Sequence, residues 1–195
     1  VSLGSLNDTV KAVTVDGVEA TVDNVKSGDY TLSRPFNIAT KGEPTGVAAD
    51  FIGFIMSADG QAIVGEDYIT VNDNAEAFTS DGSSGHITVG GSSSVSPVME
   101  QLIEAYKAVN PNAQIDLQTS DSTSGMTGAM DGTFAIGMAS RELKDEEAAE
   151  LTGTAIALDG IAVIVNTANT VDNLTMDQIR SIYVGETTDW ADVAA

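Results

Sequence analysis

Cysteine is absent from this chain, and basic residues are few. The 195 residues include no cysteine, 8 lysines and arginines, and one histidine. Without cysteine, neither a disulfide bond nor a thiolate metal site can form. The single histidine, His86, ends a polar stretch, which argues against a Ser-His-Asp catalytic arrangement.

Positive charge is scarce relative to negative charge. The 29 acidic residues outnumber the 8 basic ones, and the formal net charge is -21. Nucleic acids and anionic membrane surfaces bind through basic faces, so the composition argues against both as partners. A small anion is not excluded, because backbone N–H dipoles act locally and salt screens the overall field within about 10 Å.

Long apolar runs and the common catalytic motifs are also missing. The sequence has no run of about 18 apolar residues, the length typical of a membrane-spanning helix. It has neither the phosphate-binding pattern G-x-x-x-x-G-K-[ST] nor the nucleophile pattern G-x-S-x-G. Asp121 and Asp159 could supply an all-oxygen metal site, but a loop and a turn explain them more simply. We therefore expect no enzymatic activity, no metal and no cofactor.

The apolar pattern of the remaining sequence begins with β structure. Residues 1–28 are typical of short strands, with a hairpin turn at Asp16-Gly17 followed by a second strand. Residues 30–40 form an extended candidate, in which Pro35 indicates an edge strand or a crossing segment. An amphipathic helix is expected to follow.

The second half of the chain alternates strands and helices. A polar segment at about 72–85 is interpreted as a flexible linker. From residue 86 onward, short apolar runs alternate with helical patterns. Such alternation is typical of a largely parallel sheet with helices on its faces. We therefore predict an α/β fold with a mixed, mostly parallel sheet flanked by helices.

Hydroxyl side chains gather at three successive strand-to-helix junctions. The junctions are Gly91-Ser92-Ser93-Ser94, Ser120-Asp121-Ser122-Thr123-Ser124-Gly125 and Ala139-Ser140-Arg141-Glu142. Ligands of open parallel sheets bind at the carboxyl ends of strands, where helix N-termini offer N–H groups and a positive dipole end. The junctions therefore predict an oxyanion held by N–H groups and hydroxyls. The alternative is three unrelated helix caps.

Arg141 is one of the few basic residues and lies in the third junction. Its planar guanidinium matches the geometry of phosphate or carboxylate groups. The alternative is a salt bridge to Glu142, Asp145 or Glu146 on the following helix. The sequence leaves both interpretations open.

Three motifs resemble the phosphate-binding proteins of bacterial ABC phosphate importers. They are GGSSSVSPVME at 90–100, QTSDSTSG at 118–125 and IGMASRELKDEE at 136–147. The segments at 158–166 and 182–190 resemble the same family, so the resemblance extends over nearly the whole chain. It implies an α/β lobe of the periplasmic-binding-protein type II superfamily.

The order of the segments is unusual for that family. Residues 1–8, 29–36 and 54–64 resemble its C-terminal third, yet here they come first, which implies a circular permutation through the linker. The family's Arg-x-x-Gly-Ser-Gly-Thr-Arg-like segment, which clamps the anion from the second lobe, does not occur in this sequence. The resemblance implies a remnant of the second lobe at 1–28 and a first lobe at 29–195. We expect a fragment in which phosphate binding is weakened.

The junctions and the resemblance together assign phosphate contacts to one set of residues. The set is Ser92, Ser93, Ser94, Ser122, Thr123, Ser140 and Arg141. By the resemblance, Ser140 or Arg141 stands where many family members have an aspartate, which accepts a hydrogen bond from protonated phosphate and helps to exclude sulfate. Arginine offers charge but no acceptor, so that selectivity mechanism is not expected here.

The resemblance implies an extracellular solute-binding protein that delivers inorganic phosphate to an ABC permease. It would be attached to the cell surface as a lipoprotein, or periplasmic in a Gram-negative organism. Two alternatives stay open: a binder of another oxyanion, and a surface or interaction protein that keeps the fold without transporting. A serine-based phosphatase would need a base beside the serines. The incomplete second lobe also suggests self-association.

Overall fold

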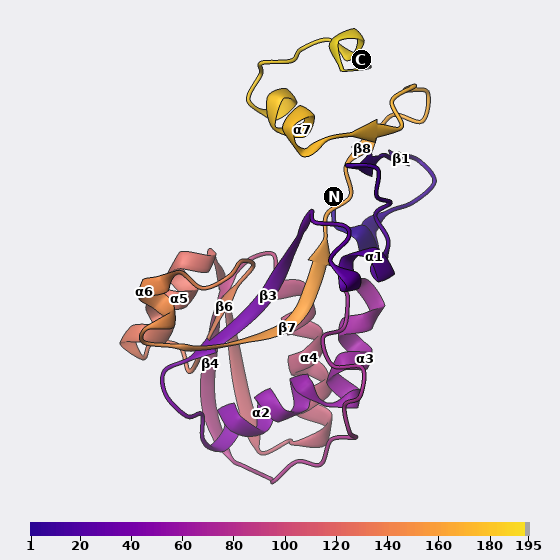
Figure 1. Cartoon of the computed structure of the whole chain (residues 1–195). Helices are drawn as coiled ribbons and strands as arrows, with labels where there is room; N and C mark the ends of the chain where they lie inside the picture. The colour runs from indigo at the N-terminus through magenta and orange to yellow at the C-terminus, as the bar shows by residue number, and fades with distance from the viewer. Residues whose placement is uncertain (194–195) are drawn as a thin grey trace. The chain divides into compact units, whose positions relative to one another are not determined.

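The computed structural model describes residues 1–193, which divide into two compact units (Figure 1). One unit is Arg34–Leu158, and the other joins Val1–Ser33 to the chain from Asp159 onward. This division differs from the expected boundary at residue 28, because strands near the N-terminus pair with strands from the C-terminal segment. The interpretation of 1–28 as a remnant of a second lobe stays a prediction.

The unit Arg34–Leu158 is built on a five-stranded sheet. Its strands are β3 (Ser33–Thr40), β4 (Gly85–Ser92), β5 (Ala113–Ser120), β6 (Ile136–Ala139) and β7 (Thr152–Gly160). Its helices are α2 (Gly46–Met56), α3 (Ala58–Asp67), α4 (Ser96–Val109), α5 (Ser122–Asp131) and α6 (Asp145–Ala148). The strand order is β5-β4-β6-β3-β7, with β4 parallel to both β5 and β6, and β3 antiparallel to β6. The predicted mixed α/β sheet is confirmed.

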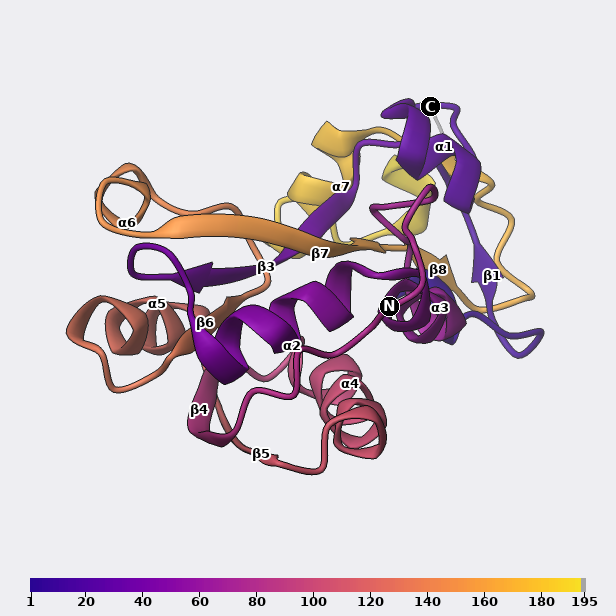
Figure 2. The ribbon, with the colours of Figure 1, turned by 90° about the horizontal axis from the view of Figure 1, so that it is seen from below.

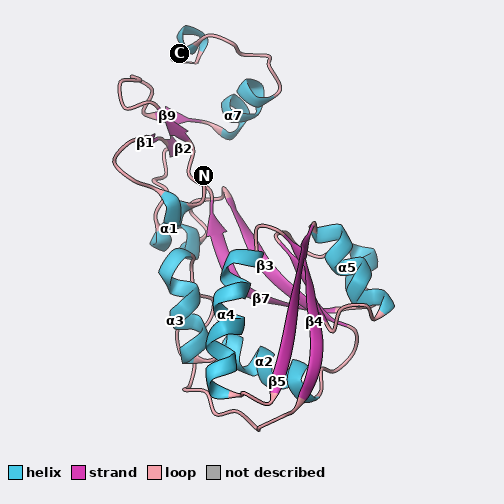
Figure 3. Ribbon diagram, turned by 180° about the vertical axis from the view of Figure 1, so that it is seen from behind, coloured by secondary structure: helices cyan, strands magenta, loops and turns pink. Residues whose placement is uncertain are grey.

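Helices cover both faces of this sheet. Figures 2 and 3 show α2, α3 and α4 on one side and α5 on the other. Successive strand residues point to opposite faces. Accordingly, Ile38 joins the apolar cluster under α2 and α4, while its neighbour Ala39 packs with Met126 and Ala129 of α5. The chain therefore passes from β4 to β5 over one face and from β5 to β6 over the other, which makes β4 the point where the topology switches direction.

Strand β3 does not lie at an edge, so the edge alternative for Pro35 is wrong. The crossing alternative agrees with the structure, because the chain passes from one compact unit to the other between Ser33 and Arg34. The strand lies between β6 and β7. Its pairing with β6 covers Asn37, Ile38 and Ala39, and Pro35 precedes that stretch. Because proline interrupts a ladder only where its missing N–H is needed, the strand tolerates it there.

The expected linker has no helix or strand from residue 72 to 84, but side-chain contacts anchor it. The buried carboxylate of Asp50 accepts hydrogen bonds from Ser80 Oγ at 2.6 Å and from the Asp81 amide at 2.9 Å. The ring of Phe78 packs edge-on against Phe54, with centroids 5.3 Å apart. The interpretation as a flexible linker therefore needs correction, because the segment forms part of the packed unit.

The other unit contains short elements. They are η1 (Leu3–Ser5), β1 (Lys11–Ala12), β2 (Thr14–Val15), α1 (Val22–Ser27), β8 (Ile164–Val165), β9 (Asn173–Leu174), α7 (Met176–Tyr183) and η2 (Trp190–Asp192). Val15 and Val18 exchange backbone hydrogen bonds at 2.9 Å across the predicted Asp16-Gly17 turn. The strand expected after this turn is wrong, because the Thr21 side chain accepts from Asn24 N and begins α1 instead.

Among the described residues, no single helix combines the length and apolar character needed to cross a membrane. Only α2 and α3 taken together pass that test by length and composition, with a 61° bend between them.

Candidate functional site

The three hydroxyl-bearing junctions meet at one edge of the sheet. The parallel register pairs Ser92 of β4 with Ser120 of β5, and Gly91 of β4 with Met138 of β6. The carboxyl ends of these three strands therefore lie side by side. The chain leaves each end for a following helix, which gives the predicted convergence of the junctions a structural basis.

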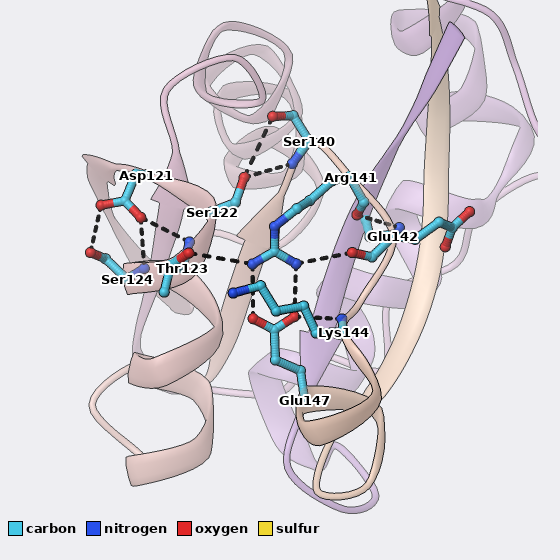
Figure 4. A network of polar contacts seen from close by, with 10 residues as sticks. Asp121, Ser122, Thr123, Ser124, Ser140, Arg141, Glu142, Lys144 and Glu147 are labelled. Atoms are coloured by element: carbon cyan, nitrogen blue, oxygen red, sulfur yellow. Dashed lines mark hydrogen bonds and ion pairs between the residues drawn. The ribbon is translucent and has the colours of Figure 1, made fainter.

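Three serine hydroxyls form a cluster at this edge. Ser92 Oγ donates a hydrogen bond to Ser140 Oγ at 3.0 Å. Ser122 Oγ lies 3.5 Å from Ser140 Oγ and accepts from the Ser140 amide at 3.1 Å. Figure 4 shows Ser122 and Ser140 facing each other beside Arg141. We refer to Ser92, Ser122 and Ser140 as the hydroxyl cluster.

Glycines bring α5 close enough to supply Ser122. A Cβ added to Gly91 would lie 2.9 Å from Gly125 Cα, and one added to Gly125 would lie 2.8 Å from Gly91 Cα. Both would also collide with the carbonyl oxygen of Met138. Gly91 has φ 138°, a conformation that side chains rarely adopt. The first turn of α5 therefore packs directly on the backbone of β4 and β6.

Arg141 is paired with a carboxylate that the sequence did not single out. Its Nη1 and Nη2 donate to Oε2 and Oε1 of Glu147, each at 2.8 Å. The ion pair is therefore real, but its carboxylate is that of Glu147 rather than that of Glu142, Asp145 or Glu146. Glu142 accepts from Arg141 Nη1 only through its backbone carbonyl, at 2.9 Å. Glu147 lies in α6, which places it within reach of the third junction.

The bidentate pair is half shielded from solvent. The Glu147 side chain is 4% exposed and the Arg141 side chain 30%. The hydrogen bonds from Arg141, joined by one from the Lys144 amide, hold the pKa of Glu147 below its ordinary value. The same bonds raise the pKa of Arg141. Both groups are charged at neutral pH, and most of the positive charge of Arg141 is balanced locally.

Three amides of the second junction are already occupied. Asp121 Oδ1 accepts from the amides of Thr123 at 2.8 Å and Ser124 at 3.0 Å, and the Asp121 carbonyl accepts from Gly125 N. The amides of Thr123, Ser124 and Gly125 are therefore not available to an anion, whereas the Ser122 amide makes no hydrogen bond to another described residue. That N–H groups of this junction hold an anion stays a prediction, now for Ser122 alone. The side chain of Thr123 instead accepts from Arg141 Nη2 at 3.5 Å.

The first junction does retain amides for a ligand. The Ser93 amide donates to the Ser120 carbonyl at 3.0 Å, which removes it from any ligand. The amides of Ser94, Ser96 and Val98 make no hydrogen bond to another described residue. Within residues 1–193, no side-chain hydrogen bond joins Ser93 or Ser94 to the hydroxyl cluster.

The chemistry of the edge is that of hydrogen-bond donation. No histidine, lysine or carboxylate hydrogen-bonds to Ser122 Oγ or Ser140 Oγ within the described part of the chain. In the same part, no group of three or more histidine, aspartate or glutamate side chains is placed to hold a metal ion. Hydroxyls, free amides and a guanidinium suit an anionic ligand with several acceptor oxygens.

Comparison with known proteins gives consistent relatives. A PBP superfamily domain matches residues 76–195. Phosphate-binding protein PstS 2 of Streptococcus agalactiae serotype V is 49% identical over 195 residues, which cover 99% of this chain and 67% of the relative. Phosphate-binding protein PstS 2 of Streptococcus pneumoniae serotype 4 is 44% identical over 191 residues, which cover 97% and 66%. The chain thus spans about two thirds of the length of these relatives.

Solved structures agree with the sequence relatives. A phosphate-binding protein of a phosphate ABC transporter from Streptococcus pneumoniae has a TM-score of 0.94 and 43% identity, over 99% of this chain and 76% of its own. A phosphate ABC transporter substrate-binding protein with bound phosphate from Clostridium perfringens has a TM-score of 0.50 and 43% identity, over 55% of this chain and 45% of its own.

Proposed function

Because this chain belongs to the PstS family of phosphate-binding proteins, we propose that it binds inorganic phosphate and delivers it to an ABC permease. The membership places it in the PBP superfamily. The proposal puts the protein on the outer side of the cytoplasmic membrane, held by a lipid anchor or free in a periplasm. It includes no catalytic step, because a nucleophilic serine needs a base beside it.

One observation carries the proposal in this chain: two hydroxyls with hydrogens to donate converge beside an arginine. Ser140 Oγ and Ser122 Oγ are 3.5 Å apart, at the carboxyl ends of parallel strands. The Arg141 guanidinium lies beside them in Figure 4. A tetrahedral oxyanion presents several acceptor oxygens, so it can take hydrogen bonds from both hydroxyls at once.

The proposal makes this edge one wall of the phosphate site. The chain covers 67% of the Streptococcus agalactiae relative, and we place the opposite wall in the unmatched part of such relatives. Closure of two walls around an anion is a hinge motion. Phosphate binding to the present chain alone is then weaker than about 1 μM in Kd, which corresponds to about -8 kcal/mol.

Calorimetric titration with phosphate tests the proposal. We expect measurable but weak binding, and a loss of about 10-fold or more when Ser122→Ala removes one donor. Ser84→Ala is the matched control, because Ser84 is exposed and lies at the opposite end of β4. Sub-micromolar phosphate binding would contradict the proposal that this chain holds only one wall of the site. Equal phosphate affinity of the parent chain and Ser122→Ala would contradict the proposal that the site includes Ser122.

Another oxyanion is a second candidate ligand. Both Glu147 oxygens already accept from Arg141, and both Asp121 oxygens accept from the first turn of α5. We infer that neither carboxylate is dedicated to accepting the proton of a protonated phosphate, because all four oxygens are already engaged within the protein. We predict that sulfate binds within about tenfold of phosphate, a difference below about 1.4 kcal/mol. Competition calorimetry measures the ratio, and a preference for phosphate above about 100-fold would contradict it.

A further inference from the structure

Ser92 lies behind the other members of the hydroxyl cluster. It ends β4 and is 2% exposed. Its carbonyl accepts from the Val95 amide at 3.0 Å and from Ser96 Oγ at 3.3 Å, so the backbone on both sides is fixed. With so little exposed surface, Ser92 is less accessible to a ligand at the edge than the partly exposed Ser122 and Ser140 are. The expected direct contact between Ser92 and the anion is therefore not supported by its burial.

The hydroxyl of Ser92 nevertheless makes a hydrogen bond within the hydroxyl cluster. It donates to Ser140 Oγ at 3.0 Å. A serine hydroxyl has one hydrogen and two acceptor lone pairs. Once Ser140 Oγ accepts from Ser92, its own hydrogen must point elsewhere. Among residues 1–193, only Ser122 Oγ, at 3.5 Å, competes for that hydrogen. That distance is at the limit of a hydrogen bond.

We infer that Ser92 is a positioning residue, which orients the Ser140 hydroxyl as a donor to the bound oxyanion without touching the anion itself. The inference rests on the proposed function for the identity of the ligand. Donation from Ser92 also polarises the Ser140 O–H, because hydrogen bonds in a chain strengthen one another. The buried Ser92 thus sets the direction of the hydroxyl of the partly exposed Ser140.

A double-mutant cycle on phosphate binding tests whether Ser92 acts through Ser140. Ser92→Ala removes one buried oxygen and leaves every ligand-facing group in place. We expect it to weaken phosphate binding by about 3- to 10-fold, and to have no further effect in a Ser140→Ala background. An equal loss in both backgrounds, or no loss in either, would overturn the inference.

A second measurement needs no ligand and separates this inference from the proposed function. Three-bond NMR couplings report the χ1 rotamer of Ser140 in the unliganded chain. We expect one dominant rotamer in the parent chain and rotamer averaging in Ser92→Ala. An unchanged Ser140 rotamer would refute the positioning role, whether or not phosphate binds.

A matched control distinguishes the positioning role of Ser92 from a general loss of order around Ser140. Ser124 also lies in the first turn of α5, and its hydroxyl donates to Asp121 Oδ2 at 2.7 Å. Ser124→Ala should leave the Ser140 rotamer as it is in the parent chain. If phosphate fails to bind the parent chain while Ser92→Ala still frees Ser140, the proposed function fails and the positioning role stands.

Discussion

Single residues decide what the edge of the sheet can hold. Arg141 carries the charge, yet both Nη atoms are bound by Glu147 at 2.8 Å. The hydroxyls of Ser122 and Ser140, together with the amides of the first junction, remain as groups with hydrogens to offer. Arg141 therefore contributes mainly through its field, while the serines supply directed bonds.

The Arg141–Glu147 pair makes stability depend on pH. Arg141 holds the pKa of Glu147 below its ordinary value, so the carboxylate stabilises the fold at pH above about 4.3. That contribution is lost as pH falls through the lowered pKa. We expect Glu147→Gln to cost about 1–3 kcal/mol near pH 7, because it leaves a half-buried guanidinium without its counter-charge.

Urea unfolding at about pH 7 and about pH 3 measures this effect. The difference in the free energy of unfolding between the parent chain and Glu147→Gln should be smaller at the lower pH. The control is Glu146→Gln, since Glu146 is exposed on the same helix. An equal difference in the free energy of unfolding at both pH values would show that the charge of the Arg141–Glu147 pair contributes nothing to stability.

At the scale of elements, the position of α5 depends on glycine. Gly125→Ala gains helix propensity of about 1 kcal/mol but places a Cβ against backbone. That Cβ would lie 2.8 Å from Gly91 Cα, and backbone cannot rotate away. We expect a net destabilisation of about 1–3 kcal/mol, measured by chemical unfolding.

A second glycine in a helix provides the comparison. A Cβ at Gly53 in α2 would meet only Phe78 Cε2, at an ordinary 3.6 Å. Gly53→Ala should therefore be neutral or stabilising by up to about 1 kcal/mol. Equal effects of the two substitutions would contradict the account of how α5 packs.

The helices and strands also show which features could be predicted from the sequence. Strand-to-helix alternation after residue 86 predicted the sheet, and the three junctions predicted where polar groups would meet, because both signals are local. The Arg141–Glu147 pair was missed because it depends on how the chain between Arg141 and α6 folds, which the pattern alone does not show. The strand expected after Gly17 became α1, since Thr21 could cap a helix and pattern alone did not reveal it.

At the scale of the whole molecule, the chain resembles part of its relatives. It covers 76% of the Streptococcus pneumoniae phosphate-binding structure while matching it with a TM-score of 0.94. The circular permutation stays a prediction, and so does the assignment of 1–28 to a second lobe. What the chain carries completely is the sheet edge with the hydroxyl cluster.

Self-association is a further prediction at this scale. Large apolar side chains are exposed near the end of the chain, with Tyr183 83%, Val184 55% and Trp190 46% exposed. Such a group of apolar residues is typical of surfaces that bind other proteins. We expect the molar mass measured by size exclusion with light scattering to increase with protein concentration. The increase should be smaller for Tyr183→Ser. A strictly monomeric mass would contradict the prediction.

The most direct test of the central claim is an amide NMR titration of the chain with inorganic phosphate. The account predicts saturable shifts at the sheet edge, in residues 92–98, 122–124 and 140–141, with a Kd weaker than about 1 μM. It also predicts that these shifts weaken in Ser122→Ala but not in Ser84→Ala. Saturable shifts confined to other parts of the chain, or none at all, would contradict the claim that this edge is a phosphate-binding wall.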